Sequence, residues 1–548
     1  MTSSRGRTDN QVSTDVGFAQ VSGPDALHRR SSLFATDPLR QRAVLAWRVV
    51  AAIVLAQAAL HLYVVATTEF GVHRDEFLYF AMGRHLRLWQ MDFPPLIAVL
   101  ANASRSVFSD SLFAVRVMPA LVGAAIIVCA SLICRELSGG RWAQAFTALA
   151  VATAPLFLRA STLFQPVVLD QLWWSMALLG LIRVGATDGT RGWPLIGLAL
   201  GLGLLTKFSI AFVALPIVAT VLLTRWRAML VSPQAWIAAA IALIVGSPSL
   251  VGQVRLGFPV AGQMSDLRTT QLAHVTASSF VLEQPLLIGL VPCAIALLGG
   301  LALLRWRRFR SYRGVGITIG VAFTLLLVTR GKPYYAGPIY PTLIAAGATR
   351  LESLNRTRSV TLLLIGTTAM TLLLSAIALP LAVPMLSPAN TARYAAALGA
   401  RSAVSTNRGE MDRLPQDFAD MLGWEAQAKA LRTAFLSLSP EERREAVIIA
   451  GNYGEAGAAE FYRERYGLPP VVSPAGSFWF FGPGERAGRV AIGLGASKRD
   501  LAAAYRDIRT AVRIASPWSV AEEREVDVVL ARQPVASLRT LWPGWKRQ

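Results

Sequence analysis

The chain has 548 residues, 53% of them hydrophobic and 16% charged, and its mean hydropathy is +0.45. About a quarter of the residues in an ordinary soluble domain are charged, so this composition excludes a single soluble domain and indicates a membrane protein with several spans. The formal charge of +21 suits a nucleic-acid-binding protein, yet the sequence has no basic helix with interleaved aromatic residues. Because Arg and Lys also accumulate in the cytoplasmic loops of membrane proteins, we expect membrane lipids as partners and no nucleic acid.

The first 385 residues divide into a polar tail and a membrane module. Residues 1–40 are rich in Ser, Thr, Asp and Arg without apolar periodicity, so we expect a disordered cytoplasmic tail. Residues 41–385 hold apolar runs close to the roughly 20 residues that one crossing needs, and they predict about eleven transmembrane helices. The runs are 45–67, 112–134, 143–158, 163–185, 193–206, 209–224, 235–252, 281–304, 314–329, 334–349 and 360–384.

The charges of the loops predict the orientation. Basic residues gather in alternate loops, most densely between 305 and 313 and again between 350 and 358. Because basic loops stay in the cytoplasm, this bias favours a multi-pass protein of the cytoplasmic membrane with its N-terminus inside and its C-terminal part outside. The three cysteines (Cys129, Cys134 and Cys293) lie in or beside apolar runs without metal-ligand spacing or an evident disulfide pair, which is typical of packing residues.

Residues 386–548 are polar and predict a small extracytoplasmic α/β domain. A helical run covers 417–436, a strand is expected at 446–450, and a turn follows at 452–454. A short amphipathic segment at 456–466 comes next, and an aromatic patch at 478–481 precedes a Gly-Pro-Gly sequence. The fold class is therefore a polytopic α-helical membrane protein with a small C-terminal α/β domain.

The first outer loop, residues 68–111, carries an unusual density of charge. Asp75 and Glu76 are adjacent just after the first span, and Asp92 precedes two prolines. Each acid alone could be a solvated loop residue. Three acids beside a span are costly unless they face water, a partner or a substrate, so we interpret the stretch as an active-site loop.

Further polar residues fall on the same predicted side of the membrane. Asp170 lies inside an apolar run, where an ionised acid costs about 2.5–3.5 kcal/mol, so it should have a functional role or a strong partner. Lys207 and Lys332 could instead extend their ammonium groups to the membrane interface, and His274 could be an ordinary loop residue. The other candidates are Lys207, Arg268, His274, Lys332, Tyr334 and Tyr335.

Taken in order, these motifs resemble those of the GT-C glycosyltransferases, in the protein-mannosyltransferase and aminoarabinose-transferase branch. The resemblance runs over about residues 45–480, and the ordered set is more specific than any one motif. Phe93 departs from the pattern, because relatives often have Lys or His there. The matching segments are Asp75-Glu76, Asp92-Phe93-Pro94-Pro95-Leu96, Asp170, Leu204-Leu205-Thr206-Lys207, Gly331-Lys332-Pro333-Tyr334-Tyr335 with Pro338 and Pro341, Asn452-Tyr453-Gly454-Glu455-Ala456, and Tyr466-Gly467-Leu468-Pro469-Pro470.

The resemblance implies transfer of a hexosyl or pentosyl group from a polyprenyl-phosphate carrier to a hydroxyl outside the membrane. It implies Asp75 as general base with Glu76 as its neighbour, and Lys207, Lys332 and Arg268 as cations for the donor phosphate. It also implies that Asp75 and Asp92 could hold a divalent ion, Mg²⁺ or Mn²⁺, in some members. The acceptor stays open between a lipid, a glycan and a protein.

The residue types alone, without the resemblance, suffice for such a transfer reaction. A sugar phosphate already has a good leaving group, so one carboxylate near the acceptor hydroxyl and cations near the phosphate suffice. Direct displacement with one base predicts inversion at the anomeric carbon. The main alternative is a multi-pass transporter or lipid flippase, but the sequence shows no matching halves. A structural subunit that binds cell-wall components would leave the loop of acids unexplained.

Overall fold

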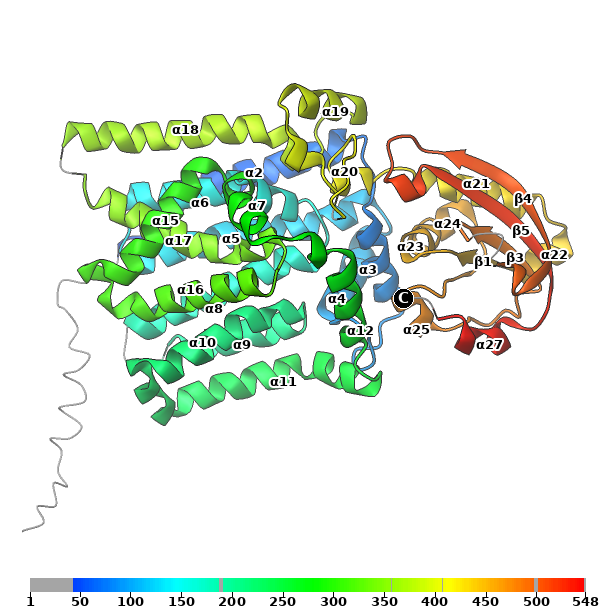
Figure 1. Ribbon diagram of the computed structural model, residues 1–548, viewed down its shortest axis with the longest axis horizontal. Helices are drawn as coiled ribbons and strands as arrows, with labels where there is room; N and C mark the ends of the chain where they lie inside the picture. Colours follow the sequence, from blue (N-terminus) through cyan, green and yellow to red (C-terminus); the bar gives the residue numbers. More distant parts are fainter. Residues whose placement is uncertain (1–42, 187–190, 356, 407, 497–500, 547–548) are drawn as a thin grey trace, which may run out of the picture. The chain divides into compact units, whose positions relative to one another are not determined.

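The computed structural model describes residues 43–186, 191–355, 357–406, 408–496 and 501–546, and Figure 1 shows their fold. The predicted tail, residues 1–40, lies outside the described residues. Most of the described chain up to about residue 385 is helical, and a five-stranded sheet forms in the C-terminal part. The predicted fold class is therefore confirmed, whereas the boundary proposed at residue 385 stays a prediction.

Six helices of the described chain are long and apolar enough to cross a membrane, which makes the chain a multi-pass membrane protein. A seventh candidate is a pair of helical segments bent by 113° at Gly289, where φ is +90°. The six are α2 (Trp47–Thr67), α5 (Leu112–Glu136), α8 (Pro166–Ala186), α11 (Pro233–Arg255), α16 (Arg313–Val328) with η4 (Arg307–Tyr312) before it, and α18 (Arg358–Ala382).

Each of the eleven predicted ranges coincides with a helix or a broken helix, although the count of eleven crossings is not confirmed. Fewer than eleven helices are long enough to cross a membrane because several helices in the predicted ranges are short or interrupted. For example, Pro155 ends one helix and begins the next within a single predicted range. The remaining helices of the predicted ranges are α6 (Arg141–Thr153), α7 (Pro155–Ala160), α9 (Trp193–Leu204), η1 (Phe208–Ile210), α10 (Ala211–Leu223), α13 (Ala277–Leu282), α14 (Gln284–Ile288), α15 (Leu290–Arg305), η5 (Pro333–Ile339) and α17 (Tyr340–Glu352).

Small residues let some of these helices approach closely. A Cβ on Gly299 of α15 would lie 1.9 Å from the Leu343 carbonyl oxygen, and one on Gly347 of α17 would lie 1.9 Å from that of Ile295. Glycine therefore allows the two helices to touch along their backbones, as expected for small residues at helix contacts in membranes.

The two longest predicted outer loops are folded. The first contains α3 (Arg74–Arg84) and α4 (Leu96–Phe108), and the second contains α12 (Pro259–Thr270) and η3 (Leu272–His274). His73 begins α3 with a capping box, in which its ring accepts from the Asp75 N–H and the Glu76 side chain accepts from the His73 N–H. This cap fixes the first turn of α3, which carries Asp75.

The C-terminal sheet has the strand order β2-β1-β3-β5-β4. β1 (Ala446–Ala450) pairs in parallel with β2 (Val471–Val472) and β3 (Val490–Leu494), while β5 (Glu525–Pro534) is antiparallel to β3 and to β4 (Tyr505–Ala515). β1 matches the predicted strand, and its five residues are all buried.

Two predictions for this part need correction. The helical run 417–436 is broken at Gly423, where φ is +90°, into α20 (Gln416–Ala419) and α21 (Trp424–Leu436). The predicted turn at 452–454 is instead the beginning of α23 (Tyr453–Phe461), because Asn452 caps that helix. The other elements are η2 (Arg225–Val231), α19 (Pro388–Ala397), η6 (Arg401–Val404), α22 (Pro440–Glu445), α24 (Arg463–Tyr466), α25 (Ser477–Phe481), η7 (Ala521–Glu523), α27 (Leu538–Leu541) and η8 (Trp542–Gly544).

The helical part and the C-terminal part share one core at α3. Phe77 of α3 is fully buried and lies 5.8 Å from the ring of Trp424 and 5.3 Å from that of Phe461, measured between centroids. In Figure 1, α3 lies beside α23 at the sheet end of the helices. The first outer loop is thus held between the two parts of the chain.

Candidate active site

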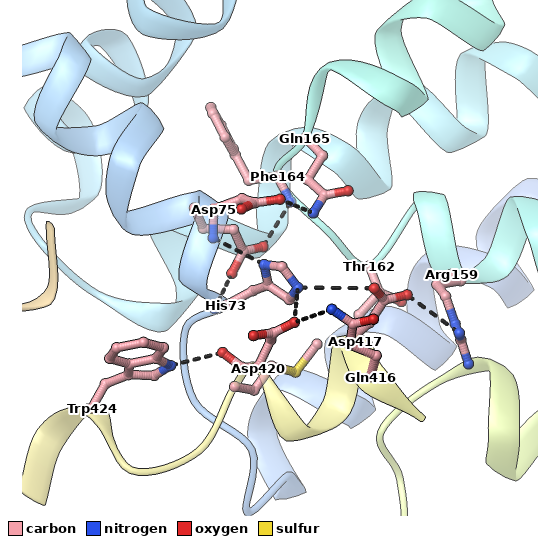
Figure 2. Close-up of polar contacts among 12 residues, drawn as sticks. His73, Asp75, Arg159, Thr162, Phe164, Gln165, Gln416, Asp417, Asp420 and Trp424 are labelled. Carbon is pink, nitrogen blue, oxygen red and sulfur yellow. Dashed lines mark hydrogen bonds and ion pairs between the residues drawn. The ribbon is translucent and has the colours of Figure 1, made fainter. Parts of the chain in front are cut away.

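Asp75 lies in the first turn of α3 and is partly buried. Its Oδ1 accepts a hydrogen bond from the Tyr453 hydroxyl at 2.9 Å. Its Oδ2 accepts one from Gln165 Nε2 at 3.1 Å (Figure 2). Because each carboxylate oxygen has two lone pairs, both can still accept a proton or a further hydrogen bond. The side chain is held in place and remains able to act as a base.

Glu76, its neighbour in the chain, lies in a different environment. It is fully buried, and its Oε1 accepts from the Phe164 N–H at 2.7 Å and from the Arg116 guanidinium. Its Oε2 accepts from the His73 N–H at 2.6 Å. Both oxygens of Glu76 thus hold the loop and neither faces solvent, which suits a neighbour that positions Asp75; a catalytic role for Glu76 stays a prediction.

Two acids that carried no signal in the sequence, the half-buried Asp417 and the buried Asp420, lie beside the buried His73. The His73 Nε2 lies 3.9 Å from a carboxylate oxygen of Asp417 and 3.9 Å from one of Asp420, and Arg159 pairs with Asp417 at 3.3 Å (Figure 2). Burial lowers the pKa of His73, but the surrounding carboxylates, led by Asp75 and Asp420, raise it overall.

Asp417 and Asp420 come from α20 and the residue after it. Burial raises the pKa of Asp420 to about 6, partly opposed by His73. Its backbone carbonyl also accepts from the Arg74 N–H at 3.0 Å. The segment before the sheet thus holds the first turn of α3 through both side chains and backbone.

Two lysines and two tyrosines form a second group. Lys207 Nζ lies 4.5 Å from the Tyr335 ring centroid and 6.0 Å from that of Tyr334, while Lys332 Nζ lies 5.8 Å from Tyr334 and donates to Gln271. The two cations, separated by 125 positions in sequence, therefore both lie near the Tyr334 ring, and their role in binding a donor stays a prediction.

The charge of Lys332 links this group to the acids. Burial lowers the pKa of Lys332, and the charge of Lys207 lowers it further. The charges of Tyr335, Asp417 and Asp75 act in the opposite direction. Lys332 is thus within electrostatic reach of both Lys207 and Asp75, and the three residues come from segments far apart in the chain.

Asp170, the candidate residue inside an apolar helix, contacts the segment that follows Lys207. It is 7% exposed, and its Oδ2 accepts from the Ser209 hydroxyl at 2.8 Å. Its charge also interacts with that of Lys207, two residues before Ser209. The Leu96 N–H donates to the Leu205 carbonyl at 2.9 Å, so the motif after Asp92 is joined directly to the motif that ends in Lys207.

Among the described residues no hydrogen bond or ion pair joins Asp92 to Asp75, and the expected metal role of the two acids stays a prediction. Asp92 is 2% exposed, and its Oδ2 accepts from the Ser477 hydroxyl at 2.7 Å. Burial raises the pKa of Asp92, with Ser477 opposing. Within the described ranges no group of three or more His, Cys, Asp or Glu side chains could hold a metal ion.

The last two candidates lie on the second outer loop. Arg268 of α12 and His274 of η3 are both exposed. No hydrogen bond or ion pair among the described residues joins either of them to Asp75 or to the lysine group. Contacts and charges thus link Asp75, Asp170, Lys207, Lys332, Tyr334 and Tyr335, whereas no hydrogen bond or ion pair of the described residues links Arg268, His274 or Asp92 to them directly.

Comparison with known proteins identifies the fold. Residues 92–251 match the family model of dolichyl-phosphate-mannose-protein mannosyltransferases. ArnT from Cupriavidus metallidurans, bound to undecaprenyl phosphate, matches with a TM-score of 0.58 at 17% identity, over 88% of this chain and 97% of that chain. The chain has the GT-C fold of ArnT. The apo state of the same ArnT matches with a TM-score of 0.57 at 18% identity. No curated protein sequence matches the chain.

The fold match with ArnT confirms the resemblance found in the sequence. The family model covers Asp92, Asp170 and Lys207, whereas Asp75, Lys332 and the C-terminal sheet lie outside the matched residues. The site therefore extends beyond the segment that the family model recognises, and its other residues are placed by the fold. Tyr453 belongs to a segment that the resemblance had singled out, whereas Gln165, Asp417 and Asp420 carried no signal of their own.

Proposed function

We propose that this protein is an inverting membrane glycosyltransferase, which moves a sugar from a polyprenyl-phosphate carrier to a hydroxyl acceptor at the outer face of the cytoplasmic membrane. The observation that carries the proposal is that Lys207 and Lys332, from distant segments, both lie near the Tyr334 ring, with Asp75 within electrostatic reach of Lys332. The match to ArnT, which was solved with undecaprenyl phosphate bound, supports a carrier of this class.

In the proposed reaction Asp75 acts as the general base. Its carboxylate, positioned by Tyr453 and Gln165, accepts the proton of the acceptor hydroxyl as that oxygen bonds to the anomeric carbon. The acceptor oxygen enters opposite the phosphate, so the configuration at the anomeric carbon inverts. One carboxylate is sufficient, because the leaving phosphate needs no proton from the enzyme.

Lys207 and Lys332 stabilise the leaving group. As the bond between the anomeric carbon and the phosphate oxygen breaks, its electron pair stays on the polyprenyl phosphate, which gains negative charge. Two ammonium groups fixed against the Tyr334 and Tyr335 rings are placed to take up that charge. The prenyl tail stays in the membrane, which explains a site at the ends of apolar helices.

The structure offers no support for the expected Mg²⁺ or Mn²⁺ site, so the proposed steps use side chains alone. Asp92 is directed at Ser477 and positions the loop after α3. Glu76 likewise positions Asp75 through its bonds to Arg116 and to the cap of α3. The two acids that sequence reasoning placed beside Asp75 are therefore assigned to holding the loop.

The test is a transfer assay with purified protein in lipid nanodiscs. Polyprenyl-phosphate sugars carrying a radiolabelled hexose or pentose should release polyprenyl phosphate, and NMR of the product should show the anomeric configuration opposite to that of the donor. Mass spectrometry of envelope lipids, glycans and exported proteins from a deletion strain should identify the acceptor. Retention of the donor's anomeric configuration would contradict the proposed mechanism.

A further inference from the structure

A cleft of about 420 Å³ lies in the C-terminal part, outside the site described above. Its floor is formed where two parallel strands end: Gly451 and Asn452 follow β1, and Gly495 and Ala496 follow β3. A Cβ on Gly451 would lie 2.9 Å from the carbonyl carbon of Gly495, so the two glycines let the ends of the strands come together.

The cleft lies at the carboxyl ends of neighbouring strands, where open α/β sheets bind their ligands. The connection after β1 leads to β2 on one side, whereas the chain after β3 leads to β4 and β5 on the other side. Connections that diverge from the carboxyl ends of neighbouring strands leave a crevice between them, and ligands bind in that crevice in open α/β sheets. The volume also falls in the usual range of ligand pockets, about 300–1,000 Å³.

The cleft does not suit an anion. The N-terminus of α23 faces it and would ordinarily favour a phosphate. Here Glu455 occupies that place, because its Oε2 accepts from the Gly451 N–H at 2.9 Å and from the Asn452 N–H at 3.1 Å. The protein's own carboxyl group therefore takes the hydrogen bonds that a phosphate would need.

The second oxygen of Glu455 is available to a ligand. Glu455 is 3% exposed and lines the cleft, yet within the described part of the chain its Oε1 has no hydrogen-bond partner. Burial, reinforced by the charge of Glu523, raises the pKa of Glu455 well above its ordinary value. Both oxygens of Glu523 accept amide N–H groups, from Asn452 and Gln427, so Oε1 of Glu455 is the carboxyl oxygen of this buried pair that a ligand in the cleft can contact.

Other carboxylates that line the cleft add hydrogen-bond acceptors, and ion pairs with arginines balance most of their charge. Glu522 pairs with Arg74 at 3.1 Å and with Arg408 at 2.7 Å, and Asp527 pairs with Arg513 at 2.9 Å. Glu525 is exposed and has no ion pair among the described residues. The Arg74 guanidinium as donor and several carboxyl groups as acceptors form a set that matches hydroxyl groups, which both donate and accept. An ammonium ion would use only the acceptors.

We propose that this cleft binds the carbohydrate part of the acceptor, a neutral, hydroxyl-rich saccharide. The proposal rests on the proposed transfer reaction and assigns its acceptor to a saccharide-bearing molecule. Arg74 joins the cleft to the reacting centre: it lines the cleft, its guanidinium lies 4.9 Å from the Tyr453 ring centroid, and Tyr453 donates to Asp75. A saccharide in the cleft would thus sit beside the first turn of α3.

The experiment measures saccharide binding without any donor. Full-length protein in nanodiscs is titrated, by saturation-transfer NMR, with methyl glycosides of D-mannose, D-glucose, D-galactose and D-arabinose, and separately with ethanolamine and inorganic phosphate. Glu525→Arg places a guanidinium among the cleft carboxylates, and Glu525→Ala removes one acceptor. Glu485→Arg is the matched control, because Glu485 is also exposed and lies outside the cleft.

At least one neutral glycoside should bind, about tenfold more weakly in Glu525→Arg, more weakly in Glu525→Ala, and unchanged in Glu485→Arg. With an active donor, Glu525→Arg should raise the KM for the acceptor and leave kcat and the KM for the donor unchanged. Absence of saccharide binding, binding unaffected by both Glu525 variants, tighter binding of ethanolamine or phosphate, or an unchanged acceptor KM would each overturn the proposal. Saccharide binding by a protein without transferase activity would refute the proposed function and leave the cleft's ligand class standing.

Discussion

At the scale of single residues, the pair formed by Arg116 and Glu76 fixes the loop that carries Asp75. Arg116 also donates to the carbonyls of Thr162 at 2.9 Å and Gly71 at 2.8 Å, so one guanidinium joins three segments. A buried ion pair contributes little net stability compared with apolar residues, but loss of one partner strands the other charge. Its role here is to fix geometry.

Arg116→Met should lower the free energy of unfolding by about 3–5 kcal/mol, because the fully buried Glu76 carboxylate loses its counter-charge. Arg444→Met is the matched control, since Arg444 pairs with Glu441 at the surface and such pairs contribute about 0–1 kcal/mol. The measurement is detergent-induced unfolding followed by Trp fluorescence. Equal effects of the two substitutions would contradict the assigned role of Arg116.

Glu455 should make stability depend on pH in a defined direction. Burial and Glu523 raise the pKa of Glu455 above its unfolded value of about 4.3, so its protonated form favours folding. That contribution is fully present below the unfolded pKa and is lost as pH rises through the folded pKa. Glu455→Gln does not titrate and keeps an oxygen for the cap of α23. Its melting temperature, compared with that of the wild type, should therefore rise between pH 5 and pH 8, and a constant difference would refute the assignment.

At the scale of elements, α3 is held against α23 by backbone contact. A Cβ on Gly457 of α23 would lie 2.7 Å from Phe77 Cβ and 2.8 Å from the Phe77 carbonyl carbon. Because part of that obstacle is backbone, it cannot move aside as a side chain could. The position of the Asp75 helix thus depends on a residue in the C-terminal part.

Gly457→Ala should cost about 1–3 kcal/mol of stability and reduce turnover, because α3 must shift to admit the methyl group. Gly366→Ala, in α18, is the control: nothing lies within 4 Å of its added Cβ, and alanine in a helix interior gains about 0.5–1 kcal/mol over glycine. Thermal unfolding and transfer rates of both variants provide the test. Wild-type behaviour of Gly457→Ala would show that the contact does not constrain α3.

The elements also show what sequence could and could not predict. Apolar runs in the sequence located the helices, and five consecutive apolar residues located β1, because residues that become buried are mostly apolar. Asp75 and Glu76 are adjacent in the sequence, which suggested that they share one environment. Neighbours on a helix point about 100° apart, so the two side chains meet different surroundings. The pairing of Asp92 with Ser477, 385 positions later, carries no local signal at all.

At the scale of the whole molecule, the site is assembled from segments far apart in the chain. Asp75 comes from the first outer loop, Lys207 and Lys332 from two helix junctions, and Tyr453 from the C-terminal part. The sequence could place the acids and lysines on one side of the membrane because topology follows from hydropathy and charge. It could not find Asp417 and Asp420, whose partner His73 lies more than 300 positions away.

Lys207→Ala and Lys332→Ala should each weaken donor binding about ten- to hundredfold, because a charge-assisted contact to phosphate contributes about 1.5–3 kcal/mol. Arg268→Ala is the comparison, since Arg268 is exposed on α12 and makes no ion pair in the described structure. Filter binding of a labelled polyprenyl-phosphate sugar gives the affinities. If both lysine variants bound the donor as the wild type does, the lysines would be interfacial anchors only.

The most direct test of the central claim is the rate of transfer by Asp75→Asn. Asparagine keeps the shape and can accept from Tyr453, but it cannot take a proton, so turnover should fall about 10²–10⁴-fold while donor affinity and thermal stability stay at wild-type values. Asp266→Asn, the same change at an exposed position of α12, should leave turnover unaltered. Turnover retained in Asp75→Asn would contradict the account.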